Sequence, residues 1–137
     1  MILVITLDFL RPESKFDSHR NSRLRRRSRA SLNLIRKSLE AARRQYAPRS
    51  KADWTGTFYQ YANRLAFHHF LSRTNGLKTR LVFLAFTNAA DVEGPVTEEE
   101  WHGATRLLHA ALGLPADLSA RRVHHAFIDA RALTDAR

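Results

Sequence analysis

Three short apolar segments of the sequence predict β-strands. Residues 2–10 form a nearly continuous β-branched run that ends at Arg11-Pro12, a pattern typical of a strand buried on both faces. Residues 81–86 repeat this pattern, and residues 123–128 form a third apolar segment of strand length. The hydrophobic pattern therefore predicts at least three strands, with helices covering the sheet.

The segments between these strands carry the periodicity of helices. From Ser31, apolar side chains recur on one helical face, and Pro48 ends the helix. A second helix is expected over 54–73, with Asp53 as its amino-terminal cap. Apolar residues occupy most of the circumference of this second helix, so we expect it to be the most buried helix.

The third helix begins with a specific local signal. Residues 97–100, Thr-Glu-Glu-Glu, form a capping box after Pro95, and Gly113 supplies a left-handed end. Helices that alternate with strands favour an α/β fold with at least partly parallel pairing. The length of 137 residues predicts a single domain over 1–137, with about three strands and three main helices.

Positive charge is concentrated near the amino end. Residues 1–51 hold 14 Lys and Arg against four acidic side chains, whereas residues 52–137 hold nine of each. Residues 11–30 lack periodicity and are expected to form an arginine-rich loop. Such a run attracts polyanions by displacing their counterions, although it is also compatible with a solvated loop. The candidate nucleic-acid contacts in it are Arg23, Arg25, Arg26, Arg27 and Arg29.

Several classes of site are excluded by what the sequence lacks. There is no cysteine, no Gly-x-Ser-x-Gly elbow and no glycine-rich phosphate loop. The seven histidines lack the spacing of a zinc-binding helix, which favours surface or core histidines over a metal site. No apolar run has the length of a membrane span, and residues 1–10 are not typical of a signal peptide. A cytoplasmic protein without a membrane partner is expected.

The second helix carries an unusual polar set. Gln60, Asn63 and Arg64 are spaced three and four residues apart, so they project from the same side of the helix. One interpretation is the exposed stripe of an otherwise buried helix. The other is a row of hydrogen-bond donors that faces a phosphate backbone or a neighbouring carboxylate.

The segment around this polar set resembles a known family. Residues 58–64, Phe-Tyr-Gln-Tyr-Ala-Asn-Arg, are similar to bacterial restriction-endonuclease-like proteins of the PD-(D/E)XK nuclease superfamily. The similarity covers roughly residues 31–130. It implies a three-layer α/β nuclease core in which a Glu-x-Lys strand and another acid bind Mg²⁺ and activate water. In that family the Glu-x-Lys strand is followed shortly by Pro-Glu.

The resemblance also implies roles for particular residues of this chain. Pro12-Glu13 match the Pro-Glu pair, so Thr6-Leu7-Asp8 stand where Glu-x-Lys is expected. Asp8 would be the remaining catalytic acid and Mg²⁺ ligand, Gln60 would organise the site, and Arg64 would contact phosphate. Because the chain begins within this strand, the resemblance implies a truncated or divergent nuclease, with degraded or absent cleavage activity.

Three hypotheses for the function follow. The first is a Mg²⁺-dependent phosphodiesterase that uses the residues just named. The second is a non-catalytic DNA- or RNA-binding protein that uses the arginine run together with Asn63 and Arg64. The third is an interaction protein whose missing elements come from a partner chain. A first strand with an exposed edge also predicts a homodimer formed through that edge.

Overall fold

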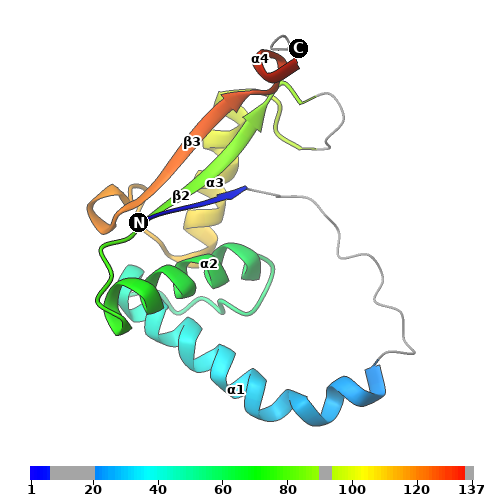
Figure 1. Ribbon diagram of the computed structural model, residues 1–137, viewed down its shortest axis with the longest axis vertical. Coiled ribbons are helices and arrows are strands. Elements are labelled where there is room, and N and C mark those ends of the chain that lie inside the picture. Colours follow the sequence, from blue (N-terminus) through cyan, green and yellow to red (C-terminus); the bar gives the residue numbers. More distant parts are fainter. Residues whose placement is uncertain (7–20, 90–93, 135–137) are drawn as a thin grey trace.

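The structure, a computed structural model, describes residues 1–6, 21–89 and 94–134 (Figure 1). Side chains are described in these ranges except at position 6, over 21–28 and at position 134. The strands are β1 (Ile2–Thr6), β2 (Arg80–Thr87) and β3 (Val123–Asp129). The helices are α1 (Asn21–Tyr46), α2 (Tyr59–His69), α3 (Glu98–Leu112) and α4 (Ala130–Thr134). A π-helical turn (Phe70–Thr74) follows α2, and a 3₁₀ turn (Ser119–Arg121) precedes β3.

The three strands form one sheet in the order β1-β2-β3, and both pairs are parallel. At its centre, Phe83 of β2 lies between Ile5 of β1 and His125 of β3. The chain passes from β1 to β2 through α1 and α2, and from β2 to β3 through α3. The predicted α/β class, the parallel pairing and the strands over 81–86 and 123–128 are therefore confirmed.

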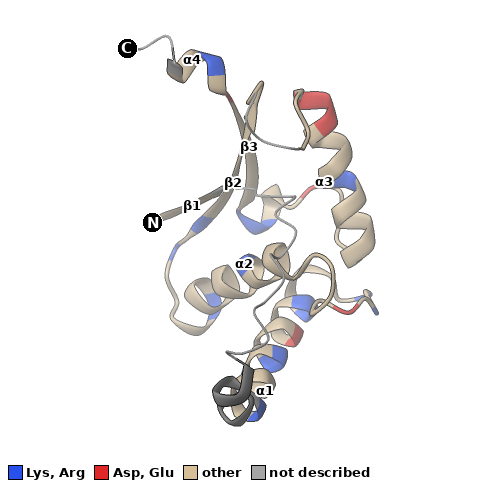
Figure 2. Cartoon of the chain, turned by 90° about the vertical axis from the view of Figure 1, so that its right-hand side faces the viewer, with Lys and Arg blue, Asp and Glu red and all other residues tan. Residues whose placement is uncertain are grey.

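Helices α2 and α3 cover one face of this sheet, and α1 packs on the outer side of α2 (Figures 1 and 2). The order β1-β2-β3 advances in one direction across the sheet. Two successive crossovers of the same hand that advance in one direction must lie on the same face. The topology by itself therefore puts the helical cover on one side.

The opposite face of the sheet corrects the prediction for the first strand. Ile2 is 64% exposed and Val4 is 56% exposed, so β1 is not buried on both faces. Among the described side chains of β1, only Leu3 and Ile5 pack against the core. Within the described residues no helix covers the face that Ile2 and Val4 share, so the expected three-layer arrangement is not seen there. Strand β1 does form an edge of the sheet, and a homodimer through this edge stays a prediction.

Helix α1 is longer than expected. The structure continues it back to Asn21, so the prediction of a loop is wrong over residues 21–30, while 11–20 lie outside the described residues. The physical reason is that arginine and leucine are among the better helix formers, and this local preference outweighs the mutual repulsion of the charges. The predicted end is confirmed, because α1 stops at Tyr46, two residues before Pro48.

The start of the second helix was also wrong. Helix α2 begins at Tyr59, and Phe58 precedes it without a side-chain capping hydrogen bond. Instead, the Asp53 carboxylate accepts hydrogen bonds from the backbone amide and the hydroxyl of Thr55, at 2.9 and 2.6 Å. An aspartate that accepts from the amide two residues later closes a local turn, which is the usual competitor of a helix cap.

The core lies between the covered face of the sheet and the helices, and it fixes the direction of α2. The Tyr61 ring stacks on Phe83, with ring centroids 4.1 Å apart, while His68 at the other end of α2 lies against the carbonyl of Thr79. Helix α2 therefore runs antiparallel to β2, and its last turn reaches the amino end of that strand. The largest fully buried side chains are Phe83, Leu65, Leu81, Val123 and Thr79.

Helix α3 begins and ends as predicted. The Thr97 side chain accepts from the Glu100 amide, and the Glu100 side chain accepts from the Thr97 amide, which completes the capping box. Gly113 ends the helix with φ of 68°. The Ser50 hydroxyl donates to the Leu112 carbonyl at 2.7 Å, which places Ser50 directly against Gly113.

Replacing Gly113 with alanine is expected to lower the free energy of unfolding by about 2–4 kcal/mol. A left-handed L-residue costs roughly 1–2 kcal/mol, and the new Cβ would lie 2.4 Å from Ser50 Oγ, which adds overpacking. Gly76→Ala is the matched control, because Gly76 has φ of +66° but no atom within 4 Å of the added Cβ. Urea unfolding should show a loss of only about 1–2 kcal/mol for the control. Equal losses in the two variants would contradict the described packing of Ser50.

Candidate functional site

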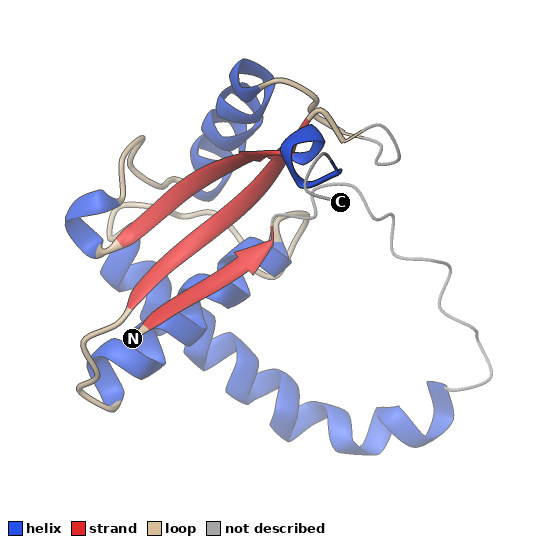
Figure 3. Ribbon diagram, turned by 45° about the horizontal axis from the view of Figure 1, so that its top comes forward, coloured by secondary structure: helices blue, strands red, loops and turns tan. Residues whose placement is uncertain are grey.

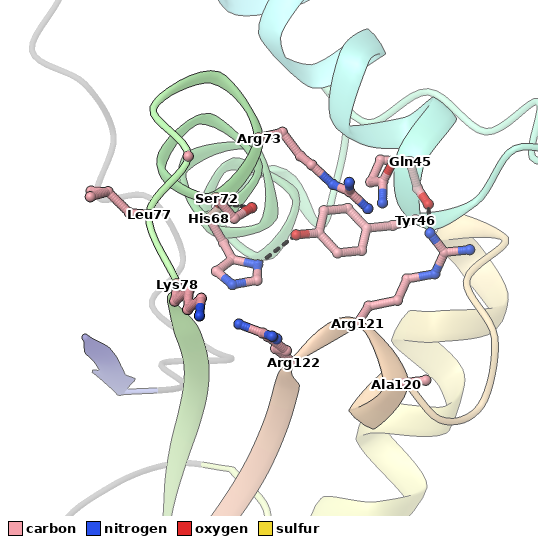
Figure 4. A pocket seen from close by; sticks show the side chains of 11 residues that line it. Gln45, Tyr46, His68, Ser72, Arg73, Leu77, Lys78, Ala120, Arg121 and Arg122 are labelled. Carbon is pink, nitrogen blue, oxygen red and sulfur yellow. Dashed lines mark hydrogen bonds between the residues drawn. The ribbon is translucent and has the colours of Figure 1, made fainter.

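A pocket of about 550 Å³ lies at the amino end of the sheet, between the ends of α1 and α2 and the starts of β2 and β3 (Figure 4). Such a volume lies in the range of small-molecule sites. The lining combines a buried tyrosine–histidine pair with four cationic side chains. The lining residues are Gln45, Tyr46, His68, Ser72, Arg73, Gly76, Leu77, Lys78, Ala120, Arg121 and Arg122.

Parallel pairing explains why the cations come together. Lys78 lies just before β2, and Arg121 and Arg122 lie just before β3. The amino ends of parallel strands meet at one edge of a sheet, so residues far apart in sequence become neighbours there. Arg73 reaches the same edge because α2 and its π-helical extension run antiparallel to the strands.

The cations of the pocket have few partners. Within the described part of the chain, the side chains of Arg73, Lys78 and Arg122 form no ion pair and no hydrogen bond. Arg121 donates to the backbone carbonyl of Gln45, which fixes it against the end of α1. The described lining contains no Asp or Glu. The result is an uncompensated concentration of positive charge in a concave site.

Arg122 occupies an unusual backbone conformation. Its φ of 62° and ψ of 32° lie in the left-handed region, which costs an L-residue roughly 1–2 kcal/mol relative to glycine. The Arg122 amide donates to the Ser119 carbonyl, and its carbonyl accepts from Leu81, so the turn joins β3 to β2. Arginine at this position thus combines a strained backbone with a side chain directed into the pocket (Figure 4).

The buried wall of the pocket is the Tyr46–His68 pair. His68 Nε2 lies 3.2 Å from the Thr79 carbonyl, so this nitrogen donates and Nδ1 is left as the acceptor. The Tyr46 hydroxyl therefore donates to Nδ1, over 2.5 Å. Burial raises the pKa of Tyr46, and burial lowers the pKa of His68, with the nearby Arg122 acting in the same direction. Both groups are therefore neutral at neutral pH.

A second tyrosine–histidine chain lies between α2, α3 and β3. His109 Nδ1 donates to the Pro115 carbonyl at 2.9 Å, so its Nε2 accepts from the Tyr61 hydroxyl at 2.8 Å. His125 Nε2 then donates to the same hydroxyl oxygen over 3.2 Å. Burial, with His109 and His102 nearby, lowers the pKa of His125 to about 4. With these tautomers, the three hydrogen bonds form while both histidines are neutral. Such a network is typical of a structural core.

The carboxyl edge of the sheet carries the opposite charge. The Asp129 carboxylate at the end of β3 pairs with Arg131 at 2.7 Å, which helps lower its pKa to about 2. The acidic first turn of α3, Glu98 to Glu100, lies at the same edge, because the indole of Trp101 donates to the Phe86 carbonyl (Figure 2). The acidic first turn of α3 and the cations of the pocket thus lie at opposite edges of the sheet.

The structure does not bring the sequence-predicted site residues of α2 to the pocket. Gln60 and Arg64 are exposed and Asn63 is half-buried, and none of the three lines it. Arg29 is exposed on α1, whereas the side chains of Arg23, Arg25, Arg26 and Arg27 are not described.

Asp8, the predicted Mg²⁺ ligand, lies outside the described residues. Among the residues that are described, no three or more His, Asp or Glu side chains are placed to hold one metal ion. Mg²⁺ requires several oxygen ligands, and the described residues therefore do not fit such a site. Mg²⁺-dependent cleavage stays a prediction of the resemblance alone.

Sequence reasoning missed the pocket, although a signal for it exists. Basic residues stand directly before two predicted strands, at Lys78-Thr-Arg80 and at Arg121-Arg122. Once parallel pairing is expected, these two clusters must share an edge of the sheet. The net charge of residues 52–137 concealed this, because the neutral sum also counts Asp129 and Glu98 to Glu100, which the fold places at the opposite edge.

No family model, curated protein or solved structure matches this chain. The nuclease resemblance therefore stays a prediction. No helix in the described ranges combines the length and the apolar character that crossing a membrane requires.

Lowering the pH from 7.5 to 5 is expected to decrease the free energy of unfolding. The folded state lowers the pKa of His68, His109 and His125, so the unfolded chain takes up protons first as the pH falls below about 6.5. His125, with a pKa of about 4, should account for about 1–2 kcal/mol of this loss. The stability contribution of these groups is therefore present above pH 6.5 and is lost progressively towards pH 4.

The check is urea unfolding at both pH values for the wild type and His125→Gln. His125→Gln should reduce the pH-dependent loss, because it removes the group whose pKa is lowered most clearly by folding. An identical loss in His125→Gln and wild type would contradict the assignment of a neutral, buried His125.

Proposed function

We propose that this protein binds nucleic acid through its phosphates, using the basic pocket together with helix α1. The observation that carries the proposal is the convergence of Arg73, Lys78, Arg121 and Arg122 on a site whose described lining holds no carboxylate. Arginine side chains bind phosphate oxygens through paired N–H groups, and a carboxylate-free site suits a ligand that only accepts hydrogen bonds.

Helix α1 extends this basic surface away from the pocket. Its last residues line the pocket, and its amino-terminal half projects from the body of the molecule (Figures 1 and 3). The exposed side chains of α1 include the cations Arg29, Arg36 and Lys37. From Arg29 to Gln45 the helix is about 24 Å long, at roughly 1.5 Å per residue. At roughly 3.4 Å per phosphate along one strand, this length spans about seven phosphates of a duplex.

The overall charge supports a polyanionic partner. The chain carries a net charge of +10. Cationic side chains that contact phosphates would release condensed counterions from a nucleic acid. This mechanism needs no base contacts, so the proposal concerns phosphate recognition and includes no sequence preference. It corresponds to a non-catalytic binding protein, the second of the hypotheses drawn from the sequence.

Salt dependence of binding tests the proposal. The affinity for a fluorescent single-stranded oligonucleotide should fall steeply between 50 and 200 mM salt, measured as fluorescence anisotropy at about five salt concentrations. Arg29→Gln with Lys37→Gln removes two exposed cations of α1 and should reduce the slope of log K against log salt by about 1.5.

Lys51→Gln with Arg106→Gln is the matched control. Both side chains are exposed, and neither lies on α1 or lines the pocket, so this variant loses the same charge but should keep the wild-type slope. Absence of binding at 50 mM salt, or an equal reduction of the slope in both variants, would reject the proposal.

A further inference from the structure

The pocket holds more positive charge than an internal phosphate of a nucleic acid requires. A phosphodiester carries a single negative charge, whereas a phosphomonoester carries about −1.5 to −2 at neutral pH. Four cations surround the space beside Tyr46 and His68, reaching it from the π-helical turn, from the segment before β2 and from the turn before β3 (Figure 4). The positive charge of these side chains reaches the wall of the pocket. Arg73 and Arg121 favour a lower pKa of Tyr46, and Arg122 favours a lower pKa of His68.

The hydrogen-bonding groups of the pocket point to the same ligand class. The Tyr46 proton is committed to His68, and the Ser72 hydroxyl donates to the His68 carbonyl at 2.7 Å. The remaining side-chain donors are the four cations and the amide of Gln45. A ligand that matches the cations has several acceptor oxygens, which describes the terminal oxygens of a phosphate group.

The pocket has room for more than a phosphate. One of its walls is formed by the buried Tyr46–His68 pair. The volume of about 550 Å³ exceeds that of a phosphate alone and leaves room for an attached sugar. The preference for a terminal over an internal phosphate therefore rests on the charge of the four cations.

We infer that the pocket is a binding site for a phosphomonoester, supplied either by the phosphorylated end of a nucleic-acid strand or by a free nucleotide. Arg73, Lys78 and Arg122 bind the phosphate oxygens, and Arg121 closes the site against the end of α1. The strand-end source rests on the proposed function, while the free-nucleotide source does not.

The first experiment compares one oligonucleotide with a 5′-phosphate, a 3′-phosphate or hydroxyls at both ends, each labelled internally, at 150 mM salt. One of the phosphorylated ends should improve the affinity of the wild type at least tenfold over the hydroxyl form. Equal binding of all three forms would reject the strand end as the source while leaving the proposed function intact. Absence of binding by all three would count against the proposed function, and it would reject the strand end as the source.

The key variant is Arg122→Gly. Glycine readily adopts the left-handed conformation found at this position, and the backbone hydrogen bonds to Ser119 and Leu81 are retained. The variant should therefore unfold at the same or a higher temperature than the wild type, yet lose the preference for the phosphorylated end. Arg106→Gln removes an exposed cation elsewhere and should keep this preference. A full preference in folded Arg122→Gly would overturn the inference.

The second experiment tests the free-nucleotide source directly. A nucleoside 5′-monophosphate is titrated against the ¹⁵N-labelled protein, with the unphosphorylated nucleoside as the control. Chemical-shift changes centred on the pocket lining, produced by the monophosphate alone, would support the inference independently of any oligonucleotide. If neither the monophosphate at millimolar concentration nor a phosphorylated end engages the lining, the pocket is not a phosphomonoester site.

Discussion

The parallel alignment of the three strands is the constraint on which the rest of the structure depends. Because all strands start at the same edge, Lys78 before β2 meets Arg121 and Arg122 before β3. Helices α2 and α3 run back antiparallel to the strands, so the end of α2 arrives at this basic edge and the acidic start of α3 lies at the other. The cations of the pocket and the acidic first turn of α3 are thereby separated to opposite edges.

The same topology confines the core to one face of the sheet, and the buried tyrosine–histidine hydrogen bonds lie within this core. Both crossovers lie on one face, so the helices bury Leu81 and Phe83 while Ile2 and Val4 remain exposed on the other. Between helices and sheet, two tyrosine–histidine chains tie α2 to its neighbours. One joins it to α1 and the segment before β2, and the other to α3 and β3. Buried hydrogen bonds of this kind are directional, so they hold the Tyr46–His68 wall of the pocket in one arrangement.

The elements that could be predicted are those decided by local pattern. The strand over 81–86 and the Thr97 capping box follow from neighbouring residues alone, and both are found. The start of α1 does not follow from the sequence pattern, because residues 21–30 lack the apolar periodicity that marks a helix. Asp53 closes a turn and does not cap a helix, because turns and caps use the same residue types. The pocket depends on contacts between segments that are distant in the sequence. Residue spacing along one helix predicts only local neighbours, such as Gln60 and Arg64.

Mapping the bound surface tests the central claim most directly. Backbone amide shifts of the ¹⁵N-labelled protein would be recorded as a 5′-phosphorylated oligonucleotide is added at 150 mM salt. The account predicts that the largest changes fall on the residues that line the pocket, from Arg73 to Lys78 and around Arg122, and that smaller changes continue along α1. Changes confined to the Gln60–Arg64 side of α2, or to the edge that carries Asp129, would contradict it.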